Sequence, residues 1–299
     1  MKHIFWAVGA AMLALTVPAH AQQSIEWKQV TNLPKGLNQP PGLKLDILGI
    51  ELGDSYAEVK AKLQKLADEY PAAPKPAGNT ANDFMLRQLG QMSGASDAPP
   101  IEERETIIRY QTPGGQITAQ FVGQIFLRRK LPSGNSKIDE TIHVLLSAPS
   151  SGAQVYAVRR SLSFDNGNQV AIATFLQALS DKMGGARPQP IGPSGNTYRY
   201  QYDNGRLVAP NPPTQDGQCA VEVVGTEMRS FARSINASGA CDVSLVVRFG
   251  FGISREHAAS AEFYLSDQER AKANKETDYA FVEAYVRGLQ SHSGAAPKL

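Results

Sequence analysis

The sequence has little charge, little cysteine and no second long apolar run, and each shortage excludes a class of protein. Charged residues make up 19% of the 299 residues and hydrophobic residues 42%, a balance that excludes an intrinsically disordered chain. Two cysteines are too few for a disulfide-rich miniprotein or a four-cysteine zinc site. A formal net charge of +2 gives no electrostatic reason to expect nucleic acid as the main partner. The length allows one large core or two modest ones.

The N-terminus has the pattern of a cleaved export signal. Lys2 provides a short positive region, an uncharged apolar stretch runs from Ile4 to Val17, and Ala19-His20-Ala21 fits the small-x-small pattern of signal peptidase. The alternative is a membrane anchor, but such a stretch rises only about 21 Å as a helix, less than the roughly 30 Å hydrocarbon core. We therefore predict a signal peptide over residues 1–21, cleavage after Ala21, and a periplasmic or secreted protein without a membrane span.

Export to an oxidising compartment bears on the two cysteines. Both Cys219 and Cys241 lie in the mature chain, and their even number predicts a disulfide. Closing this loop would stabilise the fold by roughly 3 kcal/mol in the chain-entropy model. Two buried free thiols are the alternative. A metal site is not expected, because no histidine or third cysteine lies at ligand spacing.

The first half of the mature chain has a helical pattern followed by a strand pattern. Ser55 and Glu58 can form a capping box, and apolar residues recur at helical spacing until Pro71 ends the helix. From Glu105 the period changes to two, and turn residues separate apolar segments up to Phe164. This pattern is typical of an antiparallel meander.

The second half repeats this order. Asp165-Asn166-Gly167-Asn168 is predicted to begin a helix, and hairpin strands follow up to Phe251. Ser254 is predicted to cap a helix running toward Arg270, with a second helical stretch after it. We predict an α+β fold with antiparallel sheets and helices packed on one face. The predicted segments are the signal peptide 1–21, an irregular lead-in 22–42, a first half 43–164 with an insertion at 71–100, a second half 165–290 with the disulfide and C-terminal helices, and a tail 291–299.

Two short pieces of the first half recur in the second half in the same order. Residues 63–68, Leu-Gln-Lys-Leu-Ala-Asp, match residues 176–181, Leu-Gln-Ala-Leu-Ser-Asp, and the tripeptide Arg-Tyr-Gln at 109–111 recurs at 199–201. This echo predicts a tandem duplication with an insertion in the first copy, and chance is the alternative. Helices packed on unrelated sheet surfaces would contradict the duplication.

Residues 48–59, Leu-Gly-Ile-Glu-Leu-Gly-Asp-Ser-Tyr-Ala-Glu-Val, resemble the strand-to-helix entry of bacterial periplasmic modules that pack a helix on an antiparallel sheet. Outer-membrane assembly lipoproteins of the SmpA/OmlA type are one such family, and the β-lactamase inhibitory protein type is similar to two modules in tandem. The chain also resembles exported proteobacterial proteins for which no activity follows. It departs from the lipoproteins in lacking the lipobox cysteine. The resemblance implies a helix-on-sheet fold and a binding role more than a catalytic one.

No motif for catalysis, a cofactor or a metal occurs in the sequence. It lacks His-Glu-x-x-His, Gly-x-Ser-x-Gly, Ser-x-x-Lys and a phosphate-binding loop. His143 lies in a strand pattern, His257 in the first turn of a predicted helix and His292 in the tail, so no two histidines share a motif. We therefore predict no catalytic residue, no cofactor and no metal ligand.

The basic run Arg128-Arg129-Lys130 is the sharpest charged feature. With Arg159 and Arg160 on a neighbouring predicted strand, it could form a basic edge that faces an acidic partner or an anionic glycan. The alternative, which the near-zero net charge favours, is that these charges block aggregation at a sheet edge. These five residues are the candidate binding edge.

Two functions follow as hypotheses. The first is a soluble periplasmic protein-binding or adaptor module without catalysis, whose partner is a protein of the cell envelope and not nucleic acid. The second is an exported hydrolase with a site assembled from dispersed carboxylates or from a serine and a histidine. A histidine within hydrogen-bond reach of a carboxylate and a serine would favour the enzyme, and a broad exposed apolar sheet face would favour the binder.

Overall fold

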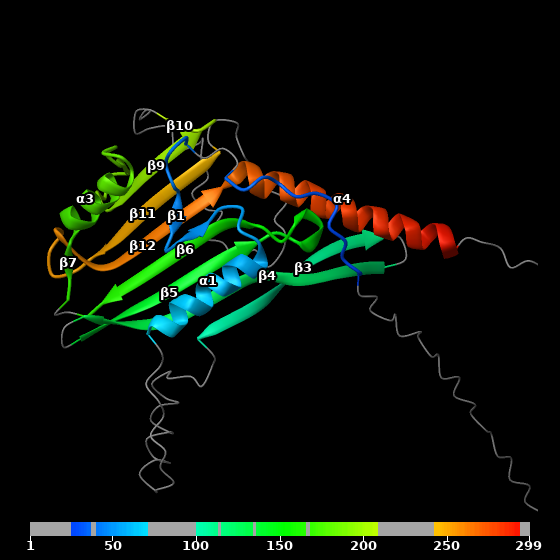
Figure 1. Ribbon diagram of the computed structural model, residues 1–299, viewed down its shortest axis with the longest axis horizontal. Helices are drawn as coiled ribbons and strands as arrows, with labels where there is room; N and C mark the ends of the chain where they lie inside the picture. Colours follow the sequence, from blue (N-terminus) through cyan, green and yellow to red (C-terminus); the bar gives the residue numbers. More distant parts are fainter. Residues whose placement is uncertain are drawn as a thin grey trace, which may run out of the picture.

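A computed structural model describes residues 25–36, 40–70, 100–112, 115–133, 136–165, 168–208 and 242–293. Within these ranges the protein is α+β, with one large antiparallel sheet, a small two-stranded sheet and three α-helices (Figure 1). The helices are α1 (Tyr56–Glu69), α3 (Ile172–Lys182) and α4 (Gln268–Ser293), with a 3₁₀ turn η1 (Pro149–Ser151). The strands are β1 (Asp46–Ile47), β2 (Ile50–Glu51), β3 (Ile101–Thr112), β4 (Gly115–Ser133), β5 (Ser136–Leu146), β6 (Val155–Phe164), β7 (Val170–Ala171), β8 (Gln189–Ile191), β9 (Thr197–Asp203), β10 (Arg206–Leu207), β11 (Val243–Phe251) and β12 (His257–Asp267).

The large sheet joins the two halves of the chain. Its strand order is β10-β9-β11-β12-β6-β5-β4-β3, with β8 paired to β9 and β7 to β12. The strands of the first half therefore occupy one side of the sheet and those of the second half the other. The two halves meet where β6 pairs with β12, and Val158 lies opposite Leu265 at this junction.

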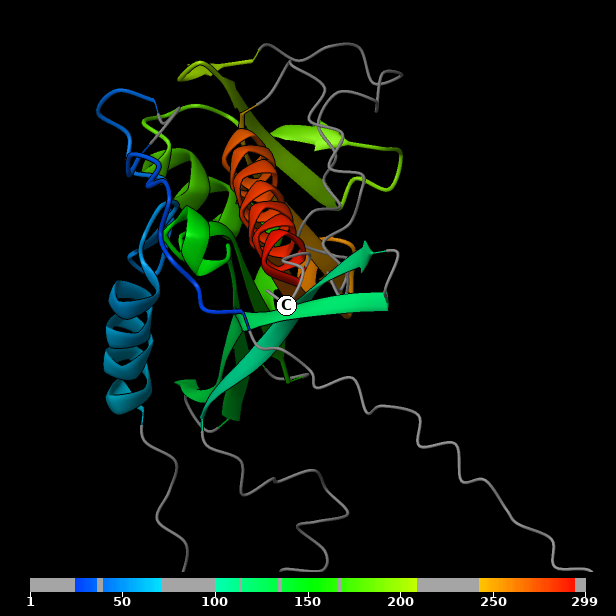
Figure 2. The ribbon, with the colours of Figure 1, turned by 90° about the vertical axis from the view of Figure 1, so that its right-hand side faces the viewer.

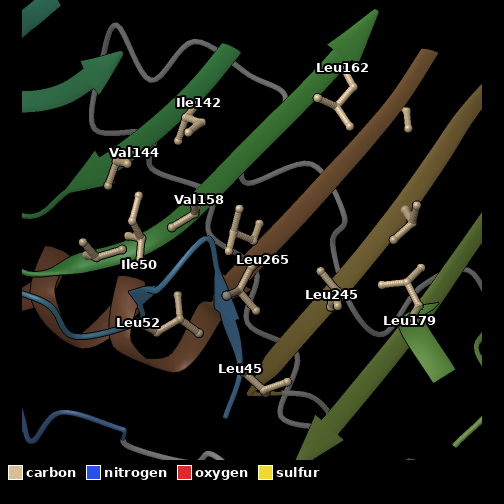
Figure 3. Close-up of a cluster of buried hydrophobic side chains, with 14 of the residues drawn as sticks. Leu45, Ile50, Leu52, Ile142, Val144, Val158, Leu162, Leu179, Leu245 and Leu265 are labelled. Carbon is tan, nitrogen blue, oxygen red and sulfur yellow. The ribbon is translucent and has the colours of Figure 1, made fainter. Parts of the chain in front are cut away.

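The main hydrophobic core lies on one face of this sheet, beneath α1, α3 and the β1–β2 hairpin. Leu45, Ile50 and Leu52 from the region of that hairpin lie over strand residues of both halves (Figure 3). Leu63 of α1 and Leu179 of α3 belong to the same buried cluster. Fully burying each such leucine contributes about 1.5–3 kcal/mol. The two halves thus share one core.

Helix α1 begins as its sequence predicts. The Ser55 hydroxyl accepts a hydrogen bond from the Glu58 backbone N–H at 3.4 Å, and the Glu58 carboxylate accepts from the Ser55 N–H at 2.8 Å. This capping box satisfies two backbone donors that the helix itself cannot. Val59 and Leu63 on its inner face are fully buried. The predicted helix and its cap are confirmed.

The prediction of a helix from Ser254 toward Arg270 is wrong. Residues His257–Asp267 form β12, which pairs with β11 on one side and β6 on the other, and α4 begins only at Gln268. The alanines and Glu262 in this segment favour a helix locally. Two long ladders of backbone hydrogen bonds outweigh that preference, because each satisfies the buried backbone groups of a central strand.

Helix α4 packs on the face opposite α1 and α3 (α4 orange to red, α1 cyan; Figure 2). Near its start, Ala271 packs with Val246 and Tyr264, whose side chains point away from the main core. Further along, Val282 and Val286 pack against the far part of the β3–β4 hairpin. The sheet therefore carries helices on both faces, where the sequence led us to expect one. No helix in the described ranges is long and apolar enough to cross a bilayer.

The predicted duplication is supported at the helices but not at the hairpins. Both α1 and α3 pack on one sheet face, and each contains the same internal bond, at 2.8 Å, from Gln64 to Asp68 and from Gln177 to Asp181. The Arg-Tyr-Gln repeats, in contrast, lie on outermost β3 and on β9, which has β8 and β10 outside it. Their positions in the sheet are not equivalent, so the duplication stays a prediction.

Candidate functional site

The sheet face opposite the main core carries a polar and aromatic surface. Cross-strand pairing places one residue from each of seven neighbouring strands in a single row, and a row of the same kind lies on either side of it. We call these three rows the open face; the start of α4 covers it at Val246 and Tyr264. The central row contains Glu102, Phe126, His143, Arg159, Tyr264, Val246 and Arg199. The flanking rows include Arg104 and Gln124 on one side, and Arg128, Thr141, Ser161, Glu262 and Arg248 on the other.

An aromatic stack flanked by arginines forms one end of the open face. The rings of Phe126 and His143 are parallel within 12°, with centroids 4.0 Å apart. The guanidinium of Arg104 lies 4.5 Å from the Phe126 ring centre and that of Arg128 lies 5.4 Å from it. Glu102 accepts hydrogen bonds of 2.6 Å from both arginines. The stack is therefore held in place by cation–π contacts and a shared carboxylate.

A second cluster forms the middle of the open face. The Glu262 carboxylate accepts hydrogen bonds from the Arg159 guanidinium and the Tyr264 hydroxyl, and this guanidinium lies 5.2 Å from the Tyr264 ring centre. Burial would raise the pKa of Glu262, but the bonds from Tyr264 and Arg159 lower it below its usual range. Burial and the neighbouring carboxylate raise the pKa of Tyr264 to about 12. At neutral pH the cluster therefore holds one anion and one cation.

His143 lies between these two clusters and is neutral. Burial, followed by the charges of Arg159, Arg104 and Arg128, lowers its pKa to about 4. Its Nε2 lies 3.1 Å from the Gln124 side-chain oxygen. A general base of the serine-hydrolase kind needs a hydroxyl on one ring nitrogen and a carboxylate on the other. The amide partner and the arginine surroundings of His143 do not supply them.

His257 does not complete a catalytic site either. His257 is the first residue of β12, not part of a helix, and its Nδ1 lies 2.9 Å from the Ser254 hydroxyl. Ser254 also accepts from the Glu256 backbone N–H at 3.2 Å, so the pair forms a local turn. No carboxylate joins this pair among the contacts of the described chain. His292 lies in the last turn of α4 and not in a tail.

The five predicted basic residues do not form one edge. Strand β4 lies between β3 and β5, and β6 lies between β5 and β12. At Arg128 the backbone N–H donates to the Pro100 carbonyl at 2.9 Å, so β4 is bonded on both sides there. Because successive side chains of a strand point to opposite faces, Arg128 and Arg159 lie on the open face, and Arg129 and Arg160 on the core face. The prediction of a continuous basic edge is wrong.

Arg129 and Arg160 form a buried cluster with Glu140 in place of a binding surface. The Glu140 side chain is fully buried and accepts hydrogen bonds from the Arg129 guanidinium and, at 2.6 Å, from Arg160. Arg129 also donates to the backbone carbonyl of Leu66 at the end of α1. The cluster therefore fastens α1 to the sheet. Lys130 pairs with Asp139 at 3.1 Å, with both side chains largely exposed.

The aromatic residues of the open face were not among the predicted site residues. Phe126 and Tyr264 sit at the polar positions of alternating strands, and this placement of aromatic residues was the available signal. No group of three histidine, cysteine, aspartate or glutamate side chains in the described ranges is placed to hold a metal ion. Comparison with family models, with curated proteins and with solved structures gave no match.

Proposed function

We propose that the protein is an exported protein-binding or adaptor module of the bacterial cell envelope, and that the open face is its binding surface. The observation that carries this proposal is the row of arginine and aromatic side chains on the open face. Arginine, tyrosine and phenylalanine are enriched at protein interfaces, and arginine and tyrosine dominate their energetic hot spots. The open face is polar as well as aromatic, so it differs from the broad apolar face that would mark a permanent interface.

The open face is also held rigid before any partner binds. Its central strands are paired on both sides, so their backbone cannot shift without breaking two ladders. Glu102 holds two arginines and Glu262 holds one, and the Phe126 ring is stacked on His143. Side chains that are already ordered lose little conformational entropy on binding. This preorganisation favours a surface that binds a partner over one that only contacts solvent.

Location in the cell envelope rests on the predicted signal peptide over residues 1–21, which lies outside the described residues. Cys219 and Cys241 lie outside them too, and we infer that they form a disulfide after export. Intact-mass measurement of the exported protein tests both inferences. We expect the mass of the chain from Gln22 onward, lowered by two hydrogens until a reductant is added. An uncleaved chain, or two alkylatable thiols before reduction, would contradict them.

Site-specific photo-crosslinking tests the binding surface. A benzoylphenylalanine is introduced at Thr141, which lies in the middle of the open face, in the full chain exported by intact bacteria. The matched control is the same residue at Thr174, which is exposed on α3 and lies away from the open face. We expect a discrete protein adduct from position 141 only. Equal adducts at both positions, or none at 141, would overturn the proposed function.

A further inference from the structure

We infer that the partner places an acidic protein segment, with several aspartate or glutamate side chains, across the open face. This inference rests on the proposed function and adds the chemistry of the partner. It follows from the charge of the three rows, from the carboxylates already bound there and from the aromatic groups between them.

The open face concentrates positive charge that the whole chain does not have. Lysine and arginine number 30 in the sequence, against 28 aspartate and glutamate residues. The three rows contain the basic residues Arg104, Arg128, Arg159, Arg199 and Arg248. Their acidic residues are Glu102 and Glu262. A local excess of one sign on a near-neutral protein attracts and orients a partner of the opposite sign.

The arginines of the open face already bind carboxylates. Glu102 accepts from two of them at 2.6 Å, and Glu262 accepts from Arg159 and from Tyr264. The side chains of Arg104 and Arg128 nevertheless stay about half exposed, at 48% and 50%. A guanidinium has five N–H donors in a planar fork. Donors are therefore left to bind further carboxylates that approach from solvent.

The aromatic groups favour a protein over a sulfated or carboxylated glycan. Phe126 and the neutral His143 lie between the arginines and present an apolar, uncharged strip. The strip ends at Tyr264 and Val246, which are buried beneath the start of α4. An acidic protein segment carries carboxylates beside apolar side chains and can pair with both. A uniformly charged polymer of sulfates would leave the strip unused.

Binding to defined polyanions tests the inference. The mature full chain is titrated with poly-L-glutamate and, separately, with heparin, at low and moderate salt. The test variant is Arg128→Ser with Arg248→Ser, two exposed positions of the open face, and the matched control is Lys65→Ser with Lys44→Ser, two exposed lysines on α1 and just before β1. Circular dichroism checks that both variants keep the wild-type fold.

We expect the open-face variant to bind poly-L-glutamate at least tenfold more weakly, as the loss of two charged contacts to a polyanion would produce. The control variant should stay within about twofold of the wild type, since its lysines lie elsewhere. Absent binding of poly-L-glutamate, equal losses in the two variants, or tighter binding of heparin than of poly-L-glutamate would each overturn the acidic partner.

The crosslink at Thr141 separates this inference from the proposed function. An adduct that weakens in the Arg128→Ser, Arg248→Ser variant, and also in about 0.5 M salt, where charges more than roughly 4–5 Å apart are screened, supports the acidic segment. An adduct that resists both changes refutes the acidic segment and leaves protein binding standing. Loss of any adduct in the wild type refutes the proposed function itself.

Discussion

The guanidinium of Arg270 donates a hydrogen bond to the side-chain oxygen of Gln154 at 3.0 Å, joining two residues that lie far apart in the chain. Both side chains are buried. Arg270 also donates to the Asp267 carboxylate at 3.1 Å and to the Pro34 carbonyl at 2.8 Å. One cation thereby ties the first turn of α4 to the sheet and to the N-terminal segment that precedes β1.

Replacing Arg270 by methionine should destabilise the fold by about 3–5 kcal/mol, because Asp267 would remain buried without its counter-charge. Urea unfolding followed by circular dichroism measures this loss. The control, Arg287→Ala, removes a guanidinium that is 73% exposed and should cost about 0–1 kcal/mol. Removing Asp267 as well, in Arg270→Met with Asp267→Leu, should recover part of the stability. A small effect of Arg270→Met alone would show that the pair contributes little.

Replacing Glu140 by glutamine should also cost about 3–5 kcal/mol, because Arg129 would lose its buried anion and Arg160 its partner. The neighbouring Asp139→Asn change is the matched control, since that carboxylate is 64% exposed, and it should cost about 0–1 kcal/mol. Chemical denaturation of both variants gives the comparison. Equal stabilities would contradict a fastening role for Glu140 at α1.

His143 should titrate near pH 4 and not near its usual 6.5, because burial and then Arg159 disfavour its charged form. A depressed pKa in the folded state means that the neutral form is favoured there. The resulting stability is fully present above the unfolded pKa of about 6.5 and is lost as pH falls through about 4. An NMR titration of the imidazole measures the midpoint. A His143→Gln variant should lose less stability over this window, and a midpoint above 6 would contradict the prediction.

Trp27 should fasten the N-terminal segment to α4. Its ring stacks on Phe281 with centroids 5.4 Å apart, meets Phe121 edge-on at 5.7 Å, and its indole N–H donates to the Gln120 carbonyl at 2.8 Å. Trp27→Ala should cost about 3 kcal/mol, the lower end for such a truncation, because the side chain is half-buried.

Hydrogen exchange locates the effect of Trp27→Ala. The amides of α4 should exchange faster, and those of β11, which Trp27 does not touch, should change much less. Trp27→Phe keeps one aromatic ring but removes the indole N–H and part of the packed ring, so it should cost less than Trp27→Ala, about 1–2 kcal/mol. Uniformly faster exchange throughout the sheet would show that Trp27 acts on the whole fold.

Local patterns predicted those parts of the fold whose determinants lie close together in the chain. The Ser55–Glu58 capping box set the start of α1, and alternation of apolar residues predicted the meander from β3 to β6. Gly184 and Gly185 follow α3 with positive φ, as a helix stop requires. The late start of α3 was not predicted, because Val170 and Ala171 first pair with β12.

For the candidate site, the sequence supplied the residue types and the tertiary structure their grouping. Arg128 and Arg159 were singled out correctly as charged strand residues, but their neighbours Arg129 and Arg160 point to the buried face. The register of neighbouring strands brings Glu140 and Glu102 to these arginines, and Glu262 reaches Arg159 across β6 and β12, which lie far apart in the chain. Pairing of this kind decided which charges are buried, which lie on the open face and that residues 257–267 form a strand. Local propensity is worth only tenths of a kcal/mol per residue. A central strand depends instead on the two strands that pair with it, and a buried ion pair depends on the residues that bring its partners together.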